Sequence, residues 1–234
     1  HIRADERSVS WYLAFSDANP ESVIACLARA KARLGGLRSR LPTEVFAVIS
    51  AGSMDASRWT ANRVARDGIY AFCHDVRNQI AVIEGTLERA VRRDEQWQLL
   101  QLGRAIERAT HIASLLRVHH ETATDQPGAA GVGDWRTLLR LASSYETYVR
   151  VALSDRDPVS PTTFLLDDPY LPMSVAYCLR QMLESLTALR AAGVTSAETL
   201  PKGSIMVAAR AAVAAAQSST PSPGLGTLSA RLDA

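Results

Sequence analysis

The chain has 234 residues, of which 47% are hydrophobic, 21% charged and 6% aromatic, and this composition excludes intrinsic disorder and collagen. Its 26 basic and 24 acidic residues leave a net charge of +2, and because arginines alternate with acids we expect no nucleic-acid binding. No run is apolar and long enough to anchor the chain in a membrane, and residues 1–234 open without a signal sequence, so we expect a cytoplasmic protein.

The first long predicted helix runs from Pro20 to about Leu41. Asn19 and Pro20 are typical of a helix start, because Asn caps free backbone N–H groups and Pro lacks an N–H that has no partner there. Gly35 and Gly36 mark a weak point, where we expect a kink or a close helix crossing. The apolar residues recur at steps of three and four, which keeps them on one helix face: Val23, Leu27, Ala30, Leu34, Leu37 and Leu41.

The middle of the chain predicts two further long helices. One covers residues 57–92, and the next begins after Asp94 and continues to about His120, each with an apolar stripe at helical spacing. Residues 122–133 are rich in Gly and Pro and predict a loop.

Shorter elements follow this loop. Asp134 is expected to cap a helix from Trp135 to about Leu153. Residues 155–171 contain three prolines, so we expect their apolar segment 164–166 to be extended rather than helical.

The last predicted helices complete an all-α helical bundle. One opens at Leu171-Pro172 and ends at Gly193, and residues 204–217 are Ala-rich and predicted helical. The sequence thus predicts one domain over residues 1–217, followed by a flexible tail over 218–234.

Three cysteines occur, Cys26, Cys73 and Cys178, without any C-x-x-C pair. An odd number at wide spacing indicates neither a disulfide framework nor a zinc site. We expect all three to be buried thiols, because Cys26 and Cys178 each lie one turn beyond an apolar residue on a core-facing helix.

An eight-residue pattern occurs twice in the chain. Residues 20–27 and 172–179 share P-x-S-V-x-x-C-L at an offset of 152 positions. We interpret this as an internal pseudo-duplication, although a recurrent way of starting a helix is an alternative. The counterpart of the helix around Glu107 would then lie before residue 1. We therefore expect that the chain lacks the start of its natural domain, or receives that part from another segment or chain.

A polar strip on the predicted 95–120 helix is the candidate chemical site. Arg104, Glu107, Arg108 and His111 follow one another at i, i+3, i+4 and i+7, so they share one helix face. Arginine can bind a carboxylate or phosphate with two hydrogen bonds, and Glu107 could orient a ligand or act as a base. The alternative is a ladder of ion pairs within the helix, which the spacing alone favours. In either case we expect Glu107 to be paired with a donor rather than left in solvent.

Two histidine clusters could suggest a metal, His74-Asp75 with Asn78 and the run His119-His120-Glu121. Neither has a recognised ligand spacing, so we expect no metal in this chain. The sequence also contains no phosphate-binding glycine loop and no nucleophile motif, so we expect no cofactor and lean against an enzyme.

Four segments together resemble a known family. They are Trp97 with LGRAIERA at 102–109, EGT at 84–86 with RDE at 93–95, NPESV at 19–23, and FLLD at 164–167 with CL at 178–179. In these segments the chain resembles the bacterial alpha-E domain, a helical domain named for its Glu-Arg motif, over about residues 8–190. The usual first helix of that family, Y-W-x-G-R-Y-x-E-R-A, has no match here, so the resemblance implies an N-terminally truncated copy.

The resemblance implies a partner with ATP-grasp ligase chemistry, as another domain or as a separate subunit, and assigns ATP and Mg²⁺ to that partner. It implies that this chain is an accessory helical module of a peptide- or amide-bond-forming system, which binds the ligase or a peptide or amino-acid substrate. Two alternatives stay open. One is a stand-alone amidoligase or hydrolase with its site around Arg104, Glu107 and Arg108, and the other is a non-catalytic protein–protein scaffold.

Overall fold

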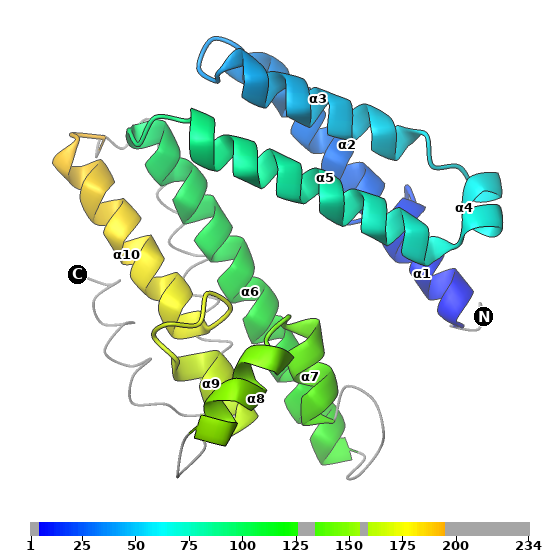
Figure 1. Cartoon of the computed structure of the whole chain (residues 1–234), viewed down its shortest axis with the longest axis vertical. Helices are drawn as coiled ribbons and strands as arrows, with labels where there is room; N and C mark the ends of the chain where they lie inside the picture. Colours follow the sequence, from blue (N-terminus) through cyan, green and yellow to red (C-terminus); the bar gives the residue numbers. More distant parts are fainter. Residues whose placement is uncertain (1–4, 126–133, 155–158, 195–234) are drawn as a thin grey trace. The chain divides into compact units, whose positions relative to one another are not determined.

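The computed structural model of the chain describes residues 5–125, 134–154 and 159–194 (Figure 1). Every regular element within these ranges is a helix, which confirms the predicted all-α fold. The chain divides into two compact units, one up to Arg92 and one from Arg93 onward. The expected helix 204–217 and tail 218–234 lie outside the described residues.

The first unit is built from five α-helices and a short 3₁₀ turn. In chain order these are α1 (Glu6–Phe15), α2 (Val23–Leu34), η1 (Gly35–Leu37), α3 (Thr43–Ser57), α4 (Ala61–Asp67) and α5 (Ile69–Ala90). Helix α3 packs along α5, and α2 packs on α3 (Figure 1). A small aromatic core forms where the Phe72 ring lies 4.6 Å from that of Phe15 and 5.6 Å from that of Trp59, between ring centres.

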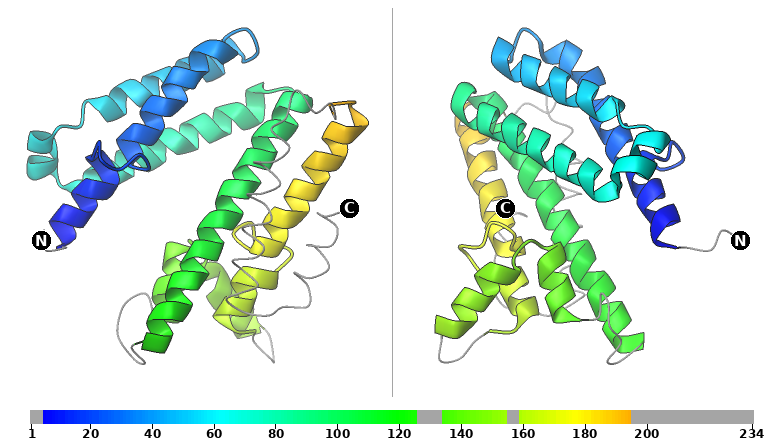
Figure 2. Two further views of the ribbon diagram at one scale, coloured as in Figure 1. Left: turned by 180° about the vertical axis from the view of Figure 1, so that it is seen from behind. Right: turned by 45° about the vertical axis from the view of Figure 1, so that its right-hand side comes forward.

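The second unit has a larger core. Its helices are α6 (Glu95–Asp125), α7 (Trp135–Leu141), α8 (Tyr145–Ser154), α9 (Pro161–Asp167) and α10 (Val175–Ala191). Helices α6 and α10 lie side by side (Figure 2). Their facing residues are fully buried with those of α7 and α9, and they include Ala109, Ile112, Leu139, Leu165 and Leu179.

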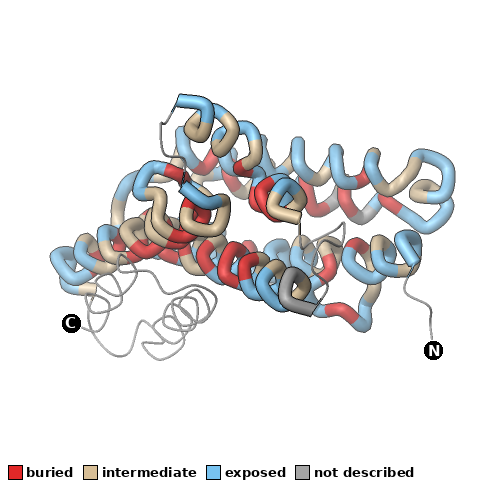
Figure 3. Tube along the Cα trace, turned by 90° about the horizontal axis from the view of Figure 1, so that it is seen from below, coloured by how far each residue is buried: buried red, intermediate tan, exposed pale blue. Residues whose placement is uncertain are grey.

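Figure 3 shows buried positions alternating with exposed ones along the helices, as amphipathic helices require. Within the described residues, no helix combines the length and apolarity that a membrane span needs.

Helix α2 begins later than the sequence predicted. Its N-cap is Ser22, whose side-chain oxygen accepts a hydrogen bond from the Ala25 N–H, whereas Asn19 fixes the preceding turn by accepting from the Glu21 N–H. The weak point at Gly35 is confirmed as the place where α2 gives way to η1.

The apolar segment 164–166 is helical, so the expectation of an extended segment was wrong. Ser160 caps α9 and Pro161 occupies its first turn, where proline costs no backbone hydrogen bond. The expectation of one long helix over residues 57–92 was also wrong. That stretch holds the end of α3, then α4 and α5, with a break at Gly68. Gly68 has a φ of 86°, a left-handed conformation that favours glycine.

The expected helix after Asp134 is capped as predicted but breaks into α7 and α8. The break lies at Ser143, which has a positive φ of 52°. Gly193 follows α10 with a φ of 75°, which confirms it as the residue that ends this helix.

Candidate functional site

The predicted polar strip lies on α6, and its four members have different surroundings. Arg104 is half-buried and one of its guanidinium nitrogens lies 3.3 Å from Oε1 of Gln101. Glu107 and His111 are exposed. The expectation that Glu107 would be shielded from solvent was therefore wrong. The i, i+3, i+4 pattern places this carboxylate on the outer side of α6, while the Ile106 and Ala109 side packs inward.

Arg108 is the strip residue that reaches another element. Its guanidinium donates to the backbone carbonyl of Pro172, 3.3 Å away, at the start of α10. Cys178 is buried beside this contact, with its sulfur 3.7 Å from the same carbonyl oxygen. Burial raises the pKa of the Cys178 thiol to about 11, although the nearby Arg108 charge acts in the opposite direction.

The other two cysteines do not follow the prediction. Cys26 on α2 and Cys73 on α5 are exposed, and only Cys178 is buried as expected. The helical pattern placed Cys26 beside apolar neighbours, but Cys26 lies on the exposed side of α2, where the Arg29 guanidinium approaches its sulfur at 3.3 Å.

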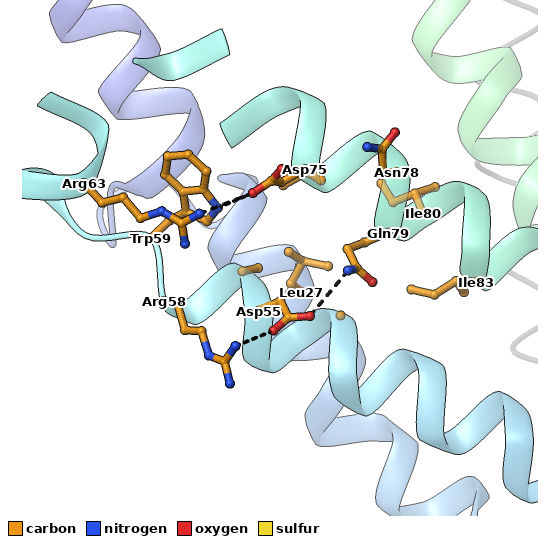
Figure 4. A pocket seen from close by; sticks show the side chains of 13 residues that line it. Leu27, Asp55, Arg58, Trp59, Arg63, Asp75, Asn78, Gln79, Ile80 and Ile83 are labelled. Carbon is orange, nitrogen blue, oxygen red and sulfur yellow. Dashed lines mark hydrogen bonds and ion pairs between the residues drawn. The ribbon is translucent and has the colours of Figure 1, made fainter. Parts of the chain in front are cut away.

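A pocket that the sequence did not reveal lies in the first unit, with a volume of about 310 Å³ (Figure 4). Helices α2, α3, α4 and α5 and the segment between α3 and α4 form its walls. Its apolar side is formed by Leu27, Val76, Ile80 and Ile83, and its polar side by two aspartates and two arginines.

One aspartate of the pocket, Asp75, is held by an indole and a guanidinium. The Trp59 Nε1–H donates to Asp75 Oδ2 at 3.2 Å, and Arg63 lies 3.6 Å from the same oxygen. The Arg63 guanidinium also stacks on the Trp59 ring at 3.9 Å from its centre. This stack fixes the indole so that its N–H points at the carboxylate.

The other aspartate, Asp55, lies across the pocket. Arg58 forms an ion pair with it at 3.0 Å, and the Gln79 side-chain amide donates to its second oxygen at 3.4 Å (Figure 4). The site thus offers a carboxylate and a guanidinium on each side of an apolar floor. This arrangement suits a small molecule with both an ammonium and a carboxylate group.

The histidine clusters give no metal site. The His74 ring lies 3.2 Å from the Asn78 amide, and Glu121 forms an ion pair with Arg117 at 3.0 Å. Among the described residues, no three His, Cys, Asp or Glu side chains are grouped so that they could hold a metal ion.

A wide groove of about 1300 Å³ lies along α1, with α4 and the start of α5 on its other side. Tyr12 and Leu13 line it and are 49% and 56% exposed, large fractions for an aromatic and an aliphatic side chain. Val64 and Ile69 line the opposite wall. An exposed apolar groove of this kind is typical of a protein-binding surface.

Comparison with known proteins supports the resemblance seen in the sequence. No curated protein and no solved structure matches the chain significantly. A family model described as "a predicted alpha-helical domain with a conserved ER motif" matches residues 1–234. Glu107-Arg108 on α6 is the Glu-Arg pair that led to the same family from the sequence. The chain therefore belongs to the Alpha-E family.

Proposed function

We propose that this chain is an accessory helical module that binds an ATP-grasp ligase in a peptide- or amide-bond-forming system. ATP and Mg²⁺ belong to the ligase, and the system works in the cytoplasm, where its ATP is available. The observation that carries this proposal is the apolar groove along α1.

The exposed residues of α1 have the spacing of a helix-binding surface. Val9, Tyr12 and Leu13 stand at i, i+3 and i+4, so they lie on one side of α1, and all three are at least 43% exposed. A monomeric protein gains nothing from a continuous apolar strip in water. Covering the strip with a partner removes that surface from water and stabilises the complex.

Co-purification tests this proposal. The tagged chain, co-expressed with an ATP-grasp ligase from the same gene neighbourhood, should retain the ligase and support ATP-dependent amide formation. A Tyr12→Ser, Leu13→Ser double variant should lose the ligase. Leu153→Ser is the matched control, because Leu153 is a still more exposed leucine on α8.

The same assay separates the alternatives. Hydrolysis of ATP or amide formation by the purified chain alone would favour a stand-alone amidoligase or hydrolase at Arg104, Glu107 and Arg108. Retention of the ligase by the α1 double variant would contradict the proposed surface. Ligase binding without any effect on amide formation would leave a non-catalytic scaffold.

A second candidate role is to hold the substrate, and the Asp55–Asp75 pocket favours it. The pocket presents an acid and a base on each side of an apolar floor, which matches the two charged ends of a short peptide. Titration with the dipeptide L-alanyl-L-leucine should give binding that Asp75→Asn weakens at least about tenfold. Glu95→Gln, in the second unit, should leave it unchanged, and equal binding to both variants would contradict this role.

A further inference from the structure

Two helix pairs in the chain share their local geometry at an offset of 152 residues. Helix α1 ends at Phe15 and α9 ends at Asp167. The residues that follow adopt nearly the same backbone angles, φ −69° and ψ 126° at Ser16 and φ −64° and ψ 118° at Asp168.

The helices that come next also begin in the same way. Ser22 and Ser174 are both buried N-caps, and their side chains accept from the N–H groups three residues on, at 3.3 Å and 3.0 Å. Their own N–H groups donate to the carbonyls of Asn19 and Leu171 at 3.0 Å and 2.9 Å. The α1–α2 and α9–α10 pairs thus share the same backbone geometry at the end of the first helix and the same capping of the second.

Burial differs at five corresponding positions of the two pairs, although Ala14 and its counterpart Leu166 are both buried. The α9–α10 residues at corresponding positions are at most 2% exposed, and they are Phe164, Leu165, Cys178, Met182 and Leu189. Their counterparts in α1, α2 and η1 are all exposed, and they are Tyr12, Leu13, Cys26, Ala30 and Leu37. The difference lies in what covers each pair. Helix α6 lies along α10, whereas the helices of the first unit that pack on α2, namely α1 and α3, leave these positions exposed.

At the corresponding place on α2, a residue of α2 itself makes the contact that α6 makes with the start of α10. The Pro172 carbonyl accepts from Arg108 of α6, whereas its counterpart, the Pro20 carbonyl, accepts from Arg29 of α2 itself. Arg29 is exposed, pairs with Glu21 at 3.4 Å and also donates to the exposed Cys26 sulfur at 3.3 Å. A guanidinium from outside could replace Arg29 at this carbonyl without disturbing a buried group.

Charge indicates what kind of helix fits this surface. Residues 22–43 contain five basic residues, Arg29, Lys31, Arg33, Arg38 and Arg40, and no acidic residue. Ala30 and Arg33 replace the larger Met182 and the neutral Ser185 of α10. The α2 surface is therefore more positive than its counterpart and leaves more room at Ala30, which favours an acidic helix with larger apolar side chains on its contact face.

We propose that the exposed side of α2 and η1, formed by Cys26, Ala30, Arg33 and Leu37, binds one amphipathic acidic helix of the ligase partner. This helix takes the position on α2 that α6 has on α10. Its apolar side chains pack over Cys26 and Ala30, its carboxylates pair with Arg33, and a basic side chain reaches the Pro20 carbonyl. The inference rests on the proposed function and adds a second contact surface, on α2, to the groove along α1, together with the element of the partner that covers it.

The cysteines provide the test. Alkylation of the full chain, alone and in complex with the ATP-grasp ligase, is followed at each thiol by mass spectrometry. In the complex, the Cys26 rate should fall at least about tenfold, because the helix covers it. Cys73 is exposed on α5 and should react equally in both samples, and Cys178 should stay slow in both.

A matched pair of variants makes the test independent of the thiols. Ala30→Glu places a charge in the middle of the proposed contact and should weaken ligase binding at least about tenfold. Ala81→Glu makes the same change at an exposed position on α5 and should leave binding unchanged. Both variants should fold, because glutamate is a good helix former at an exposed site.

The outcomes separate this inference from the proposed function. If the ligase binds but Cys26 reacts as fast as before, or Ala30→Glu binds like Ala81→Glu, the inference is overturned and the proposed function stands. If no ligase binds, both fail. If Cys26 becomes protected in the chain alone as its concentration rises, the occupant is a second copy, and the ligase helix is excluded.

Discussion

At the level of single residues, the two members of the Glu-Arg pair have different surroundings. Arg108 links α6 to the start of α10, whereas Glu107 faces solvent. We predict that Arg108→Ala lowers the free energy of unfolding by about 1.5 kcal/mol, the low end of the usual range for a hydrogen bond from a charged donor, because Arg108 is only half-buried. Glu107→Ala should change it by no more than about 0.5 kcal/mol, as at other exposed sites. Urea unfolding of both variants measures this, and equal losses would contradict it.

The Cys178 thiol gives a prediction on pH. Its pKa is raised by burial to about 11, from an ordinary value near 9.0, so the folded state holds the proton more tightly than the unfolded state. The resulting stabilisation is present below pH 9 and is lost as the pH rises from 9 toward 11. We expect the fall in unfolding free energy over this range to be smaller by about 2 kcal/mol in Cys178→Ala.

The control for this experiment is Cys73→Ala, which removes an exposed thiol. Its unfolding free energy should fall between pH 9 and 11 as steeply as that of the original protein. An equally steep fall in Cys178→Ala would show that another group controls the stability in this range.

Cys26 shows why burial was only partly predictable. The segments that lead to Cys26 and Cys178 share the pattern P-x-S-V-x-x-C-L, and both helices were expected to bury the thiol. The capping and backbone geometry, which depend on local sequence, agree between the two sites. Burial depends on which other helix packs there, and a short motif contains no information about that packing.

At the level of elements, the glycines at the end of α2 offer a stability test. Gly35 has helical backbone angles, φ −55° and ψ −42°, and a Cβ added there meets nothing within 4 Å. We predict that Gly35→Ala stabilises the protein by about 0.5–1 kcal/mol, because alanine favours the helix and restricts the unfolded chain.

Gly68 is the matched control for this substitution. It also has open space around its Cα, but its φ is 86°, which L-residues rarely adopt. Gly68→Ala should therefore destabilise the protein by about 1 kcal/mol. Thermal unfolding measures both effects, and melting temperatures that shift in the same direction in the two variants would contradict this prediction.

Helix α9 shows how a sequence signal was misread. Three prolines between residues 155 and 171 were interpreted as helix breakers, yet Ser160-Pro161 is a favourable helix start. A proline in the first turn of a helix, directly after a capping serine, starts the helix instead of breaking it. The break between α7 and α8, in contrast, depends on a positive φ at Ser143 that its residue type does not predict.

At the level of the whole molecule, the fold class follows from helical spacing, but the division into two units does not. Apolar stripes tell which side of a helix is buried, and they do not tell which helix covers it. The Asp55–Asp75 pocket was missed for the same reason. Its walls come from four separate segments between Leu27 and Ile83, and its aspartates show no motif in the sequence.

The two units differ in the size of their buried cores, and this leads to the last prediction. In the second unit, α6 and α10 share a continuous core in which Ile112, Leu179 and Met182 are fully buried. The buried core around Phe72 in the first unit is much smaller. Local opening costs least where few apolar contacts are lost, so backbone amides of α1 and α2 should exchange hydrogen faster than those of α6 and α10.

Hydrogen–deuterium exchange with mass spectrometry measures this, first on the chain alone and then with the ATP-grasp ligase bound. We expect the ligase to slow exchange in α1 and α2, because it covers their exposed apolar side chains, and to leave α10 unchanged, because α6 already covers α10. The connection between α7 and α8 is the internal control, since it lies outside the proposed contact. Slowing spread evenly over both units would instead indicate a general stabilisation of the fold and would contradict a partner surface confined to α1 and α2.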